Sequence, residues 1–288
     1  LTAPMPLGDT HIAFGNLDLR GWLAAAPATE LSGSLDLAGT EDGAVQGSFQ
    51  FSNARPTPLD ADGVPLTRGR AQLRVSDAGK WQLRALELGL LRNGLLRGEA
   101  NGRGQQANAR VQVRNFDPLI LDRRAPTLSL QGEMMLEAAV KQQKIHLALH
   151  DEQWEIAAEL LKQGMRLDVA QLRVQHGNTV VGGSGQMQLD AQRPFHLDTR
   201  LQHLNLAEFI AVPPTELNAG LAIDGTLLPE PAGLLDFVFF DSRFGGYPFD
   251  GDARLRVLPG PRAQGDLNAR LGANTLALNL RYGMTEED

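Results

Sequence analysis

The chain of 288 residues contains no cysteine, and aromatic residues make up only 6% of it. The lack of cysteine excludes disulfide bonds, cysteine zinc sites and thiol nucleophiles. Long apolar runs are also missing, since the densest, residues 233–240, contains Asp236 and falls far short of the roughly 20 residues that a spanning helix needs. The net charge is -7 and the arginines are scattered in sequence among acidic residues, which argues against nucleic acid as a partner.

Neither end of the chain carries a targeting pattern. The chain begins at Leu1 without a methionine, and no basic segment followed by an apolar stretch comes after it, so no signal peptide is predicted. It ends on the acidic residues 286–288. We therefore expect an internal fragment of a longer protein, with no transmembrane segment in the fragment itself.

Leucine and glycine are abundant in place of aromatic residues. About one residue in six is leucine, and there are 31 glycines. Through most of the chain apolar and polar residues alternate, as in strands with one buried and one solvated face. Turn residues such as Asp42-Gly43 and Asn93-Gly94 separate these runs. The sequence therefore predicts an all-β protein built as a long antiparallel meander, with alternating runs at residues 31–37, 45–51, 71–75, 107–113, 145–150, 187–189, 253–257 and 276–280.

One segment, residues 151–163, fits two structures. Asp151 is a residue type that caps helices, and Trp154, Ala157 and Leu161 are spaced as on one helix face. The same segment also alternates between apolar and polar residues from Trp154 to Leu160. It occupies the same position relative to a strand exit as residues 81–83, so we predict a strand.

Internal repeats are the strongest sequence feature. Asn16-Leu17-Asp18, followed by Pro27 and an alternating run from Leu31, returns 99 positions later at Asn115. A third copy begins near His203, and each copy has a short non-alternating stretch before its proline. Multi-strand repeats of this length stack along one axis. We predict one continuous repetitive β structure over residues 1–288, with repeats beginning near 16, 115 and 203.

These repeats resemble a known family. The segments 31–39 (LSGSLDLAG), 246–253 (GYPFDGDA) and 271–278 (LGANTLAL) are similar to those of the TamB proteins, a subunit of the bacterial translocation and assembly module within the AsmA-like group. The resemblance covers essentially the whole chain. It lies in the general pattern of the repeats and not in an invariant sequence signature. It implies an elongated antiparallel β-sheet curled into an open trough (a β-taco) with an apolar interior.

The resemblance also implies a location and a role. TamB-like proteins are periplasmic, are anchored in the inner membrane of Gram-negative bacteria and work with a TamA-like barrel of the outer membrane. The implied function is a scaffold whose hydrophobic groove supports phospholipid transport between the membranes, outer-membrane protein assembly, or both. The partners would then be phospholipid acyl chains and the barrel. The family supplies no catalytic residue, and its anchor and barrel-binding region have no counterpart in this chain.

An aliphatic lining suits this role, because a two-chain lipid with about 30 methylenes costs on the order of 24 kcal/mol to expose to water. Small aliphatic side chains leave space that abundant aromatic rings would fill. The predicted groove-lining residues are Leu35, Leu37, Val45, Phe49, Phe51, Leu73, Val75, Val111, Val113, Ile145, Leu147, Leu149, Leu167, Val169, Leu221, Ile223, Phe237, Phe239, Leu255, Val257, Leu276, Leu278 and Leu280.

No constellation points to catalysis, a metal or a cofactor. His146 and His150 would share a strand face beside Asp151, but they lack a third ligand, and we expect solvent-facing side chains. The glycines of 182–185 and 102–104 lack the lysine and the strand-to-helix context of a phosphate loop, and they are expected to form bends or bulges. We therefore predict a protein that is not an enzyme.

Two further groups have competing interpretations. Asp250 and Asp252 flank Gly251, a composition typical of a turn before a strand. The cluster 237–240 (FVFF) fits either a strand buried on both faces or positions that touch lipid. The alternative to an open trough is a closed β-sandwich or barrel of a cell-envelope binding module, in which the apolar faces pack against each other and leave no groove.

Overall fold

The computed structural model describes residues 8–21, 27–61, 63–76, 78–208, 210–227 and 230–283. The chain divides into two compact units, an N-terminal unit, Leu1–Glu152, and a C-terminal unit, Gln153–Asp288. Within the described ranges every extended strand is antiparallel to its neighbours in chain order, and the helical elements are single 3₁₀ turns. The predicted all-β antiparallel meander is confirmed.

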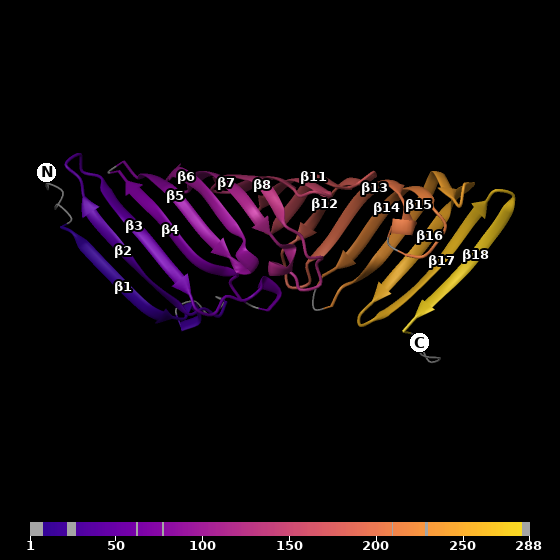
Figure 1. Ribbon diagram of the computed structural model, residues 1–288, viewed down its shortest axis with the longest axis horizontal. Coiled ribbons are helices and arrows are strands. Elements are labelled where there is room, and N and C mark those ends of the chain that lie inside the picture. The colour runs from indigo at the N-terminus through magenta and orange to yellow at the C-terminus, as the bar shows by residue number, and fades with distance from the viewer. Residues whose placement is uncertain are drawn as a thin grey trace. The chain divides into compact units, whose positions relative to one another are not determined.

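The N-terminal unit consists of nine strands that pair in chain order (Figure 1). The 3₁₀ turns η1 (Leu19–Gly21), η2 (Leu59–Ala61), η3 (Leu91–Asn93) and η4 (Pro118–Ile120) follow β1, β3, β5 and β7. Since alternate connections of a meander lie at the same end of the sheet, these four turns share one rim, and tight turns form the other. The strands are β1 Thr10–Leu17, β2 Leu31–Gly39, β3 Val45–Asn53, β4 Leu66–Val75, β5 Lys80–Leu90, β6 Leu95–Arg103, β7 Gln106–Phe116, β8 Leu130–Ala139 and β9 Gln142–His150.

The C-terminal unit repeats this plan with nine further strands and the turn η5 (Leu206–Glu208) after β13. Its pairing also follows chain order. Glycines at positive φ form the two-residue turns, as at Gly245 and Gly246, where both φ angles are positive. The strands are β10 Trp154–Gln163, β11 Arg166–His176, β12 Thr179–Gln188, β13 Pro194–Leu204, β14 Thr215–Thr226, β15 Ala232–Phe244, β16 Tyr247–Leu258, β17 Arg262–Leu271 and β18 Asn274–Tyr282.

The segment predicted with two options is a strand. Residues 154–163 form β10, and the alternation from Trp154 to Leu160 outweighs the helical spacing because β10 pairs with β11 along its length. The sheet is open and does not close on itself. The closed sandwich or barrel is therefore wrong, because the strands of each unit make their main contacts with sequential neighbours and no second layer packs on them in the described ranges.

Most of the best-buried side chains of the N-terminal unit lie toward the rim with the 3₁₀ turns, although Ala44, 4% exposed, lies in a turn of the other rim. Ile120 on η4 is 3% exposed, and Leu130 at the start of β8 is 1% exposed. Leu90, at the end of β5, is 6% exposed. The loops themselves are joined, since the backbone N–H of Asp60 donates to the carbonyl of Leu121. The unit therefore has a small core along one rim instead of a central core between two layers.

The three predicted repeat positions share a backbone feature. Asn16, Asn115 and His203 all have positive φ, at 52°, 50° and 55°, and each lies at a shift of strand register. Such bulges bend a strand and end its pairing. In each case the chain then leaves the strand into a 3₁₀ turn.

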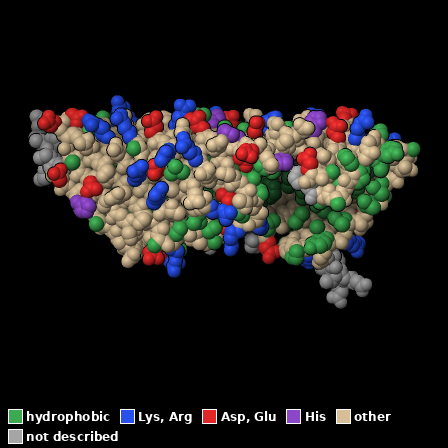
Figure 2. Space-filling model, in the orientation of Figure 1, with side chains coloured by type: hydrophobic (Ala, Val, Ile, Leu, Met, Phe, Trp, Pro, Cys, Tyr) green, Lys and Arg blue, Asp and Glu red, His purple; other side chains and the backbone are tan. Residues whose placement is uncertain are grey.

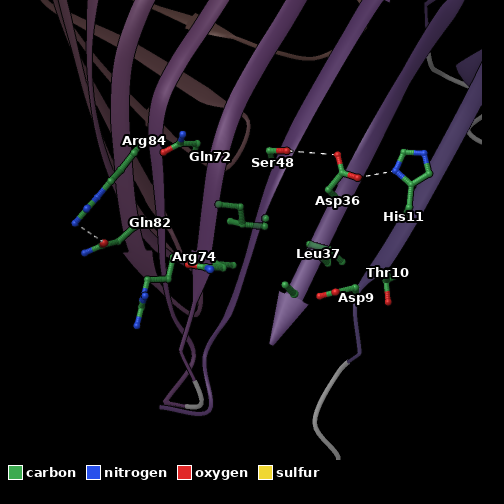
Figure 3. Close-up of a pocket in the computed structure, with 14 residues that line it drawn as sticks. Asp9, Thr10, His11, Asp36, Leu37, Ser48, Gln72, Arg74, Gln82 and Arg84 are labelled. Atoms are coloured by element: carbon green, nitrogen blue, oxygen red, sulfur yellow. Dashed lines mark hydrogen bonds and ion pairs between the residues drawn. The ribbon is translucent and has the colours of Figure 1, made fainter. Parts of the chain in front are cut away.

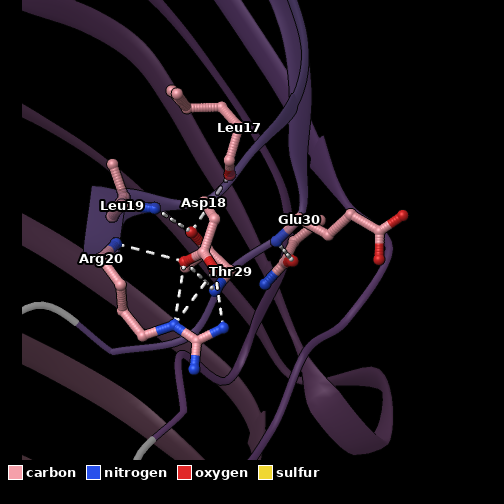
Figure 4. A network of polar contacts seen from close by, with 7 residues as sticks. Leu17, Asp18, Leu19, Arg20, Thr29 and Glu30 are labelled. Carbon is pink, nitrogen blue, oxygen red and sulfur yellow. Dashed lines mark hydrogen bonds and ion pairs between the residues drawn. The ribbon is translucent and has the colours of Figure 1, made fainter. Parts of the chain in front are cut away.

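Polar side chains close these turns. Asp18, Asp117 and Asn205 each accept a hydrogen bond from the backbone N–H two residues later. The hydroxyl of Thr29 accepts from the N–H of Leu19 and donates to the carbonyl of Leu17 (Figure 4). Thr215 makes the equivalent bonds to residues 206 and 204. Hydrogen bonding to the Arg20 side chain, and then to its backbone N–H, lowers the pKa of Asp18 to about 2.

Candidate functional site

The pairing register places apolar side chains from consecutive strands of the N-terminal unit on one face. Residues directly opposite in an antiparallel pair point to the same side of the sheet. Leu35 is opposite Phe49, which is opposite Ala71, and Val113 is opposite Gly132, which is opposite Leu149. We call this side the N-terminal apolar face. Of the predicted lining residues it contains Leu35, Leu37, Val45, Phe49, Phe51, Leu73, Val75, Val111, Val113, Ile145, Leu147 and Leu149.

The C-terminal unit has an equivalent surface, the C-terminal apolar face. Ile223 is opposite Leu235, which is opposite Leu255 on the next strand. Figure 2 shows hydrophobic side chains gathered around a hollow on the part of the molecule formed by the later strands. The register places all the remaining predicted residues on this face, namely Leu167, Val169, Leu221, Ile223, Phe237, Phe239, Leu255, Val257, Leu276, Leu278 and Leu280.

Both apolar faces are only partly covered. Phe49 is 36% exposed, whereas the predicted lining residues Val111, Val113 and Leu149 are buried. On β18, which pairs with β17 alone and is exposed along its whole length, Leu278 and Leu280 are 53% and 54% exposed. Large apolar surface left in water is characteristic of sites that bind an apolar partner.

Glycines keep aromatic rings flat against the N-terminal apolar face. Gly69 lies opposite Phe51, and a Cβ added there would be 2.2 Å from Cε1 of that ring. Gly102 lies opposite Trp81 in the same way, with the added Cβ 2.6 Å from the indole. The rings therefore cover the backbone of the next strand and do not project far from the sheet.

Aromatic side chains also pack side by side along each face. The ring centroids of Phe49 and Phe51 are 5.5 Å apart. In the C-terminal unit Phe239 meets the edge of Phe249 at 5.1 Å and stacks on Phe237 at 6.2 Å. These contacts are of the favourable offset and edge-to-face types. They stabilise a single-layer apolar surface without a covering element.

The cluster at residues 237–240 is not buried on both sides. Phe237 and Phe239 lie on the C-terminal apolar face, whereas Val238 points to the opposite side and is 59% exposed. The guanidinium of Arg200 lies over the ring of Phe240, with its Cζ 4.8 Å from the ring centroid. The interpretation as a doubly buried strand is therefore wrong.

Other sequence candidates lie in regular strands. Residues 182–185 are part of β12, and the irregularity expected there is on the neighbouring strand β11, between Val169 and Leu172. Asp250 and Asp252 lie within β16 instead of in a turn, and Asp250 pairs with Arg270. His146 and His150 share the polar face of β9. No group of three metal-ligating side chains occurs among the residues described.

The opposite, polar face of the N-terminal unit concentrates arginines that are scattered in the sequence. Register brings Arg70 of β4 opposite Glu87 of β5 and Arg97 of β6 opposite the same glutamate. Both guanidinium groups are 3.0 Å from the Glu87 carboxylate. The hydrogen bond from Arg70, and then that from Arg97, lowers the pKa of Glu87 although desolvation acts to raise it. Figure 2 shows the basic side chains on this part of the molecule. Sequence inspection missed this surface because the residues come from three different strands.

Concave depressions lie on this polar face. One, of about 670 Å³, is lined by His11, Asp36, Ser48, Gln72 and Arg84, among others (Figure 3). His11 and Asp36 are 2.5 Å apart. Two neighbouring depressions, of about 640 and 660 Å³, share Arg70.

Comparison with known proteins gives no relative. No protein-family model, curated protein or solved structure matches this chain. Within the described ranges, no helix has the length and apolar character needed to cross a membrane.

Proposed function

We propose that the two apolar faces bind acyl chains, and that the protein is a periplasmic scaffold of the TamB or AsmA-like type without enzymatic activity. In this proposal the faces line a hydrophobic groove of a trough that supports phospholipid transport between the inner and outer membranes, outer-membrane protein assembly, or both. The parent protein would be anchored in the inner membrane and would engage a TamA-like barrel.

One observation carries the proposal. The register aligns apolar side chains on one face of consecutive strands in each unit, and large side chains of inner strands such as Phe49 and Phe237 remain partly exposed. Burying one methylene of a lipid chain is worth about 0.8 kcal/mol, so contact with even a few methylenes favours binding. A surface of leucine, valine and phenylalanine offers few directional contacts, which suits ligands with variable chains.

Photo-crosslinking tests the proposal at single positions. A photoreactive amino acid replaces Phe49 or Leu278 on the apolar faces, and the protein is incubated with phospholipid vesicles. We expect lipid adducts by mass spectrometry from these positions. Matched probes at Gln50 and Ala277 lie next to them in sequence and on the opposite face.

The two sets of positions make the result decisive. Adducts from the apolar set and none from the polar set would support acyl-chain binding. Equal labelling of both sets, or labelling of the polar set alone, would refute it, because adjacent residues of a strand differ only in the face they occupy.

A further inference from the structure

A continuous polar groove runs along β3 and β4 on the side opposite the N-terminal apolar face. Its three depressions overlap, since two share Gln50 and Arg70 and two share Ser48 and Gln72. The line from Ser52 to Gln46 covers seven residues of β3, which at about 3.3 Å per residue is roughly 20 Å. We call this surface the β3–β4 groove.

Side-chain length explains the groove. The polar faces of β2 and β3 present short hydroxyl and amide side chains, including Ser32, Ser34 and Ser48, together with Asp36, whose carboxylate is paired with His11. The polar faces of β4 to β6 present long arginines, including Arg70 and Arg97. Short side chains form a floor, and the arginines form one wall.

The wall has an excess of positive charge although the chain has a net charge of -7. On the polar faces of β4 to β7 the only acidic residues are Glu87 and Glu99. Arg68 and Arg84 line the groove and have no carboxylate partner within ion-pair distance among the described residues. The cationic residues of these faces are Arg68, Arg70, Arg74, Lys80, Arg84, Arg97, Arg103, Arg110 and Arg114.

We propose that the β3–β4 groove binds a linear anionic glycan. The serine and glutamine side chains of the floor hydrogen-bond sugar hydroxyls, and Arg68 and Arg84 pair with carboxylate or phosphate groups of the chain. Arginine suits both groups because its planar guanidinium donates two parallel hydrogen bonds. Glu87 already pairs with Arg70 and Arg97, so the acidic groups of the glycan meet Arg68 and Arg84, of which Arg84 donates, among the described residues, only to the side-chain amide of Gln82.

Other polyanions fit this surface less well. Proteins that bind single-stranded nucleic acid stack bases on aromatic side chains, and the polar faces of β2 to β6 carry none in the described residues. A lipid bilayer is flat on this scale and would not reach the floor of a groove. The proposal is independent of acyl-chain binding on the opposite face.

Binding of defined oligosaccharides tests the inference. Fluorescence anisotropy compares labelled hexagalacturonate with an uncharged galactose hexamer, a hexaglutamate peptide and phosphatidylglycerol vesicles. We expect hexagalacturonate to bind at least about tenfold more tightly than the neutral hexamer and the peptide, with an affinity that falls as salt rises. The double variant Arg68→Gln/Arg84→Gln should weaken binding about tenfold.

A matched control separates the groove from general charge. Arg243→Gln/Arg256→Gln removes the same two charges from the polar face of the C-terminal unit and should leave the affinity unchanged. Equal binding of the peptide or the neutral hexamer, or binding only of the vesicles, would overturn the proposal. So would an equal loss in the two double variants, or no loss in the first.

Discussion

The substitution Leu278→Asp distinguishes between two interpretations of the C-terminal apolar face, as a ligand-binding surface or as a packed core. Leu278 lies on β18 opposite Leu267 and is 53% exposed. Fully burying a leucine side chain is worth about 1.5–3 kcal/mol, so this half-exposed residue contributes about 1 kcal/mol to folding. A carboxylate at this position can remain in water in the absence of ligand. We therefore expect Leu278→Asp to lower the free energy of unfolding by only about 1 kcal/mol.

The same substitution should affect acyl-chain binding more strongly. A carboxylate keeps water around it, and a bound chain would lose contact at about three methylenes. At about 0.8 kcal/mol each, this loss is about 2.4 kcal/mol, or a roughly 60-fold weaker affinity. Titration of the protein with a fluorescent fatty acid measures the affinity, and urea unfolding measures the stability.

Ala277→Asp is the control, because residue 277 is adjacent on the same strand but pairs with Asn268 on the polar face. It adds the same charge and should change neither affinity nor stability by a comparable amount. The reasoning is refuted if both variants weaken binding equally. It is also refuted if Leu278→Asp unfolds the protein while Ala277→Asp does not, since that result would mean that the face is a packed core.

Three further predictions concern stability. The substitution Leu130→Ala should lower the free energy of unfolding, measured in urea, by about 3 kcal/mol, because Leu130 is 1% exposed. Met135→Ala on the same strand should lower it much less, because Met135 is 38% exposed. Equal losses in the two variants would contradict a core at the rim. The substitution Thr215→Ala should lower the free energy of unfolding by about 1 kcal/mol or more, because the Thr215 hydroxyl bridges the backbone of residues 204 and 206. Thr215→Ser keeps the hydroxyl and should retain most of the stability. Equal losses in the two variants would assign the effect to the methyl group. Asp224, and then Asp198, raise the pKa of His196, so its stabilising contribution is present below its ordinary pKa of 6.5 and is lost as pH rises through the higher folded value. An NMR titration should give a His196 pKa above 6.5, and the stability advantage over His196→Gln should shrink from pH 6 to pH 8; a pKa at or below 6.5 would contradict the two ion pairs.

The alternation of residue types by itself determined the strands and their two faces. In a strand, successive side chains point to opposite sides, so the pattern around Leu35 and Leu37 already fixed which residues share a side. The same local rule gave the correct structure at residues 154–163. Even the bulges at Asn16, Asn115 and His203 lie at positions that the repeat had marked.

Only the tertiary structure determined which residues of different strands are neighbours. Arg70 and Arg97 are 27 positions apart, and only the register of β4, β5 and β6 brings both to Glu87. That register depends on bulges such as the one at Ala85, which has positive φ and which residue alternation alone does not locate. For the same reason the core at Ile120 and Leu130 was missed, because it forms where loops from different hairpins meet. Local periodicity fixes the side of a sheet to which a residue points, whereas its neighbours on that side are set by pairing between distant segments.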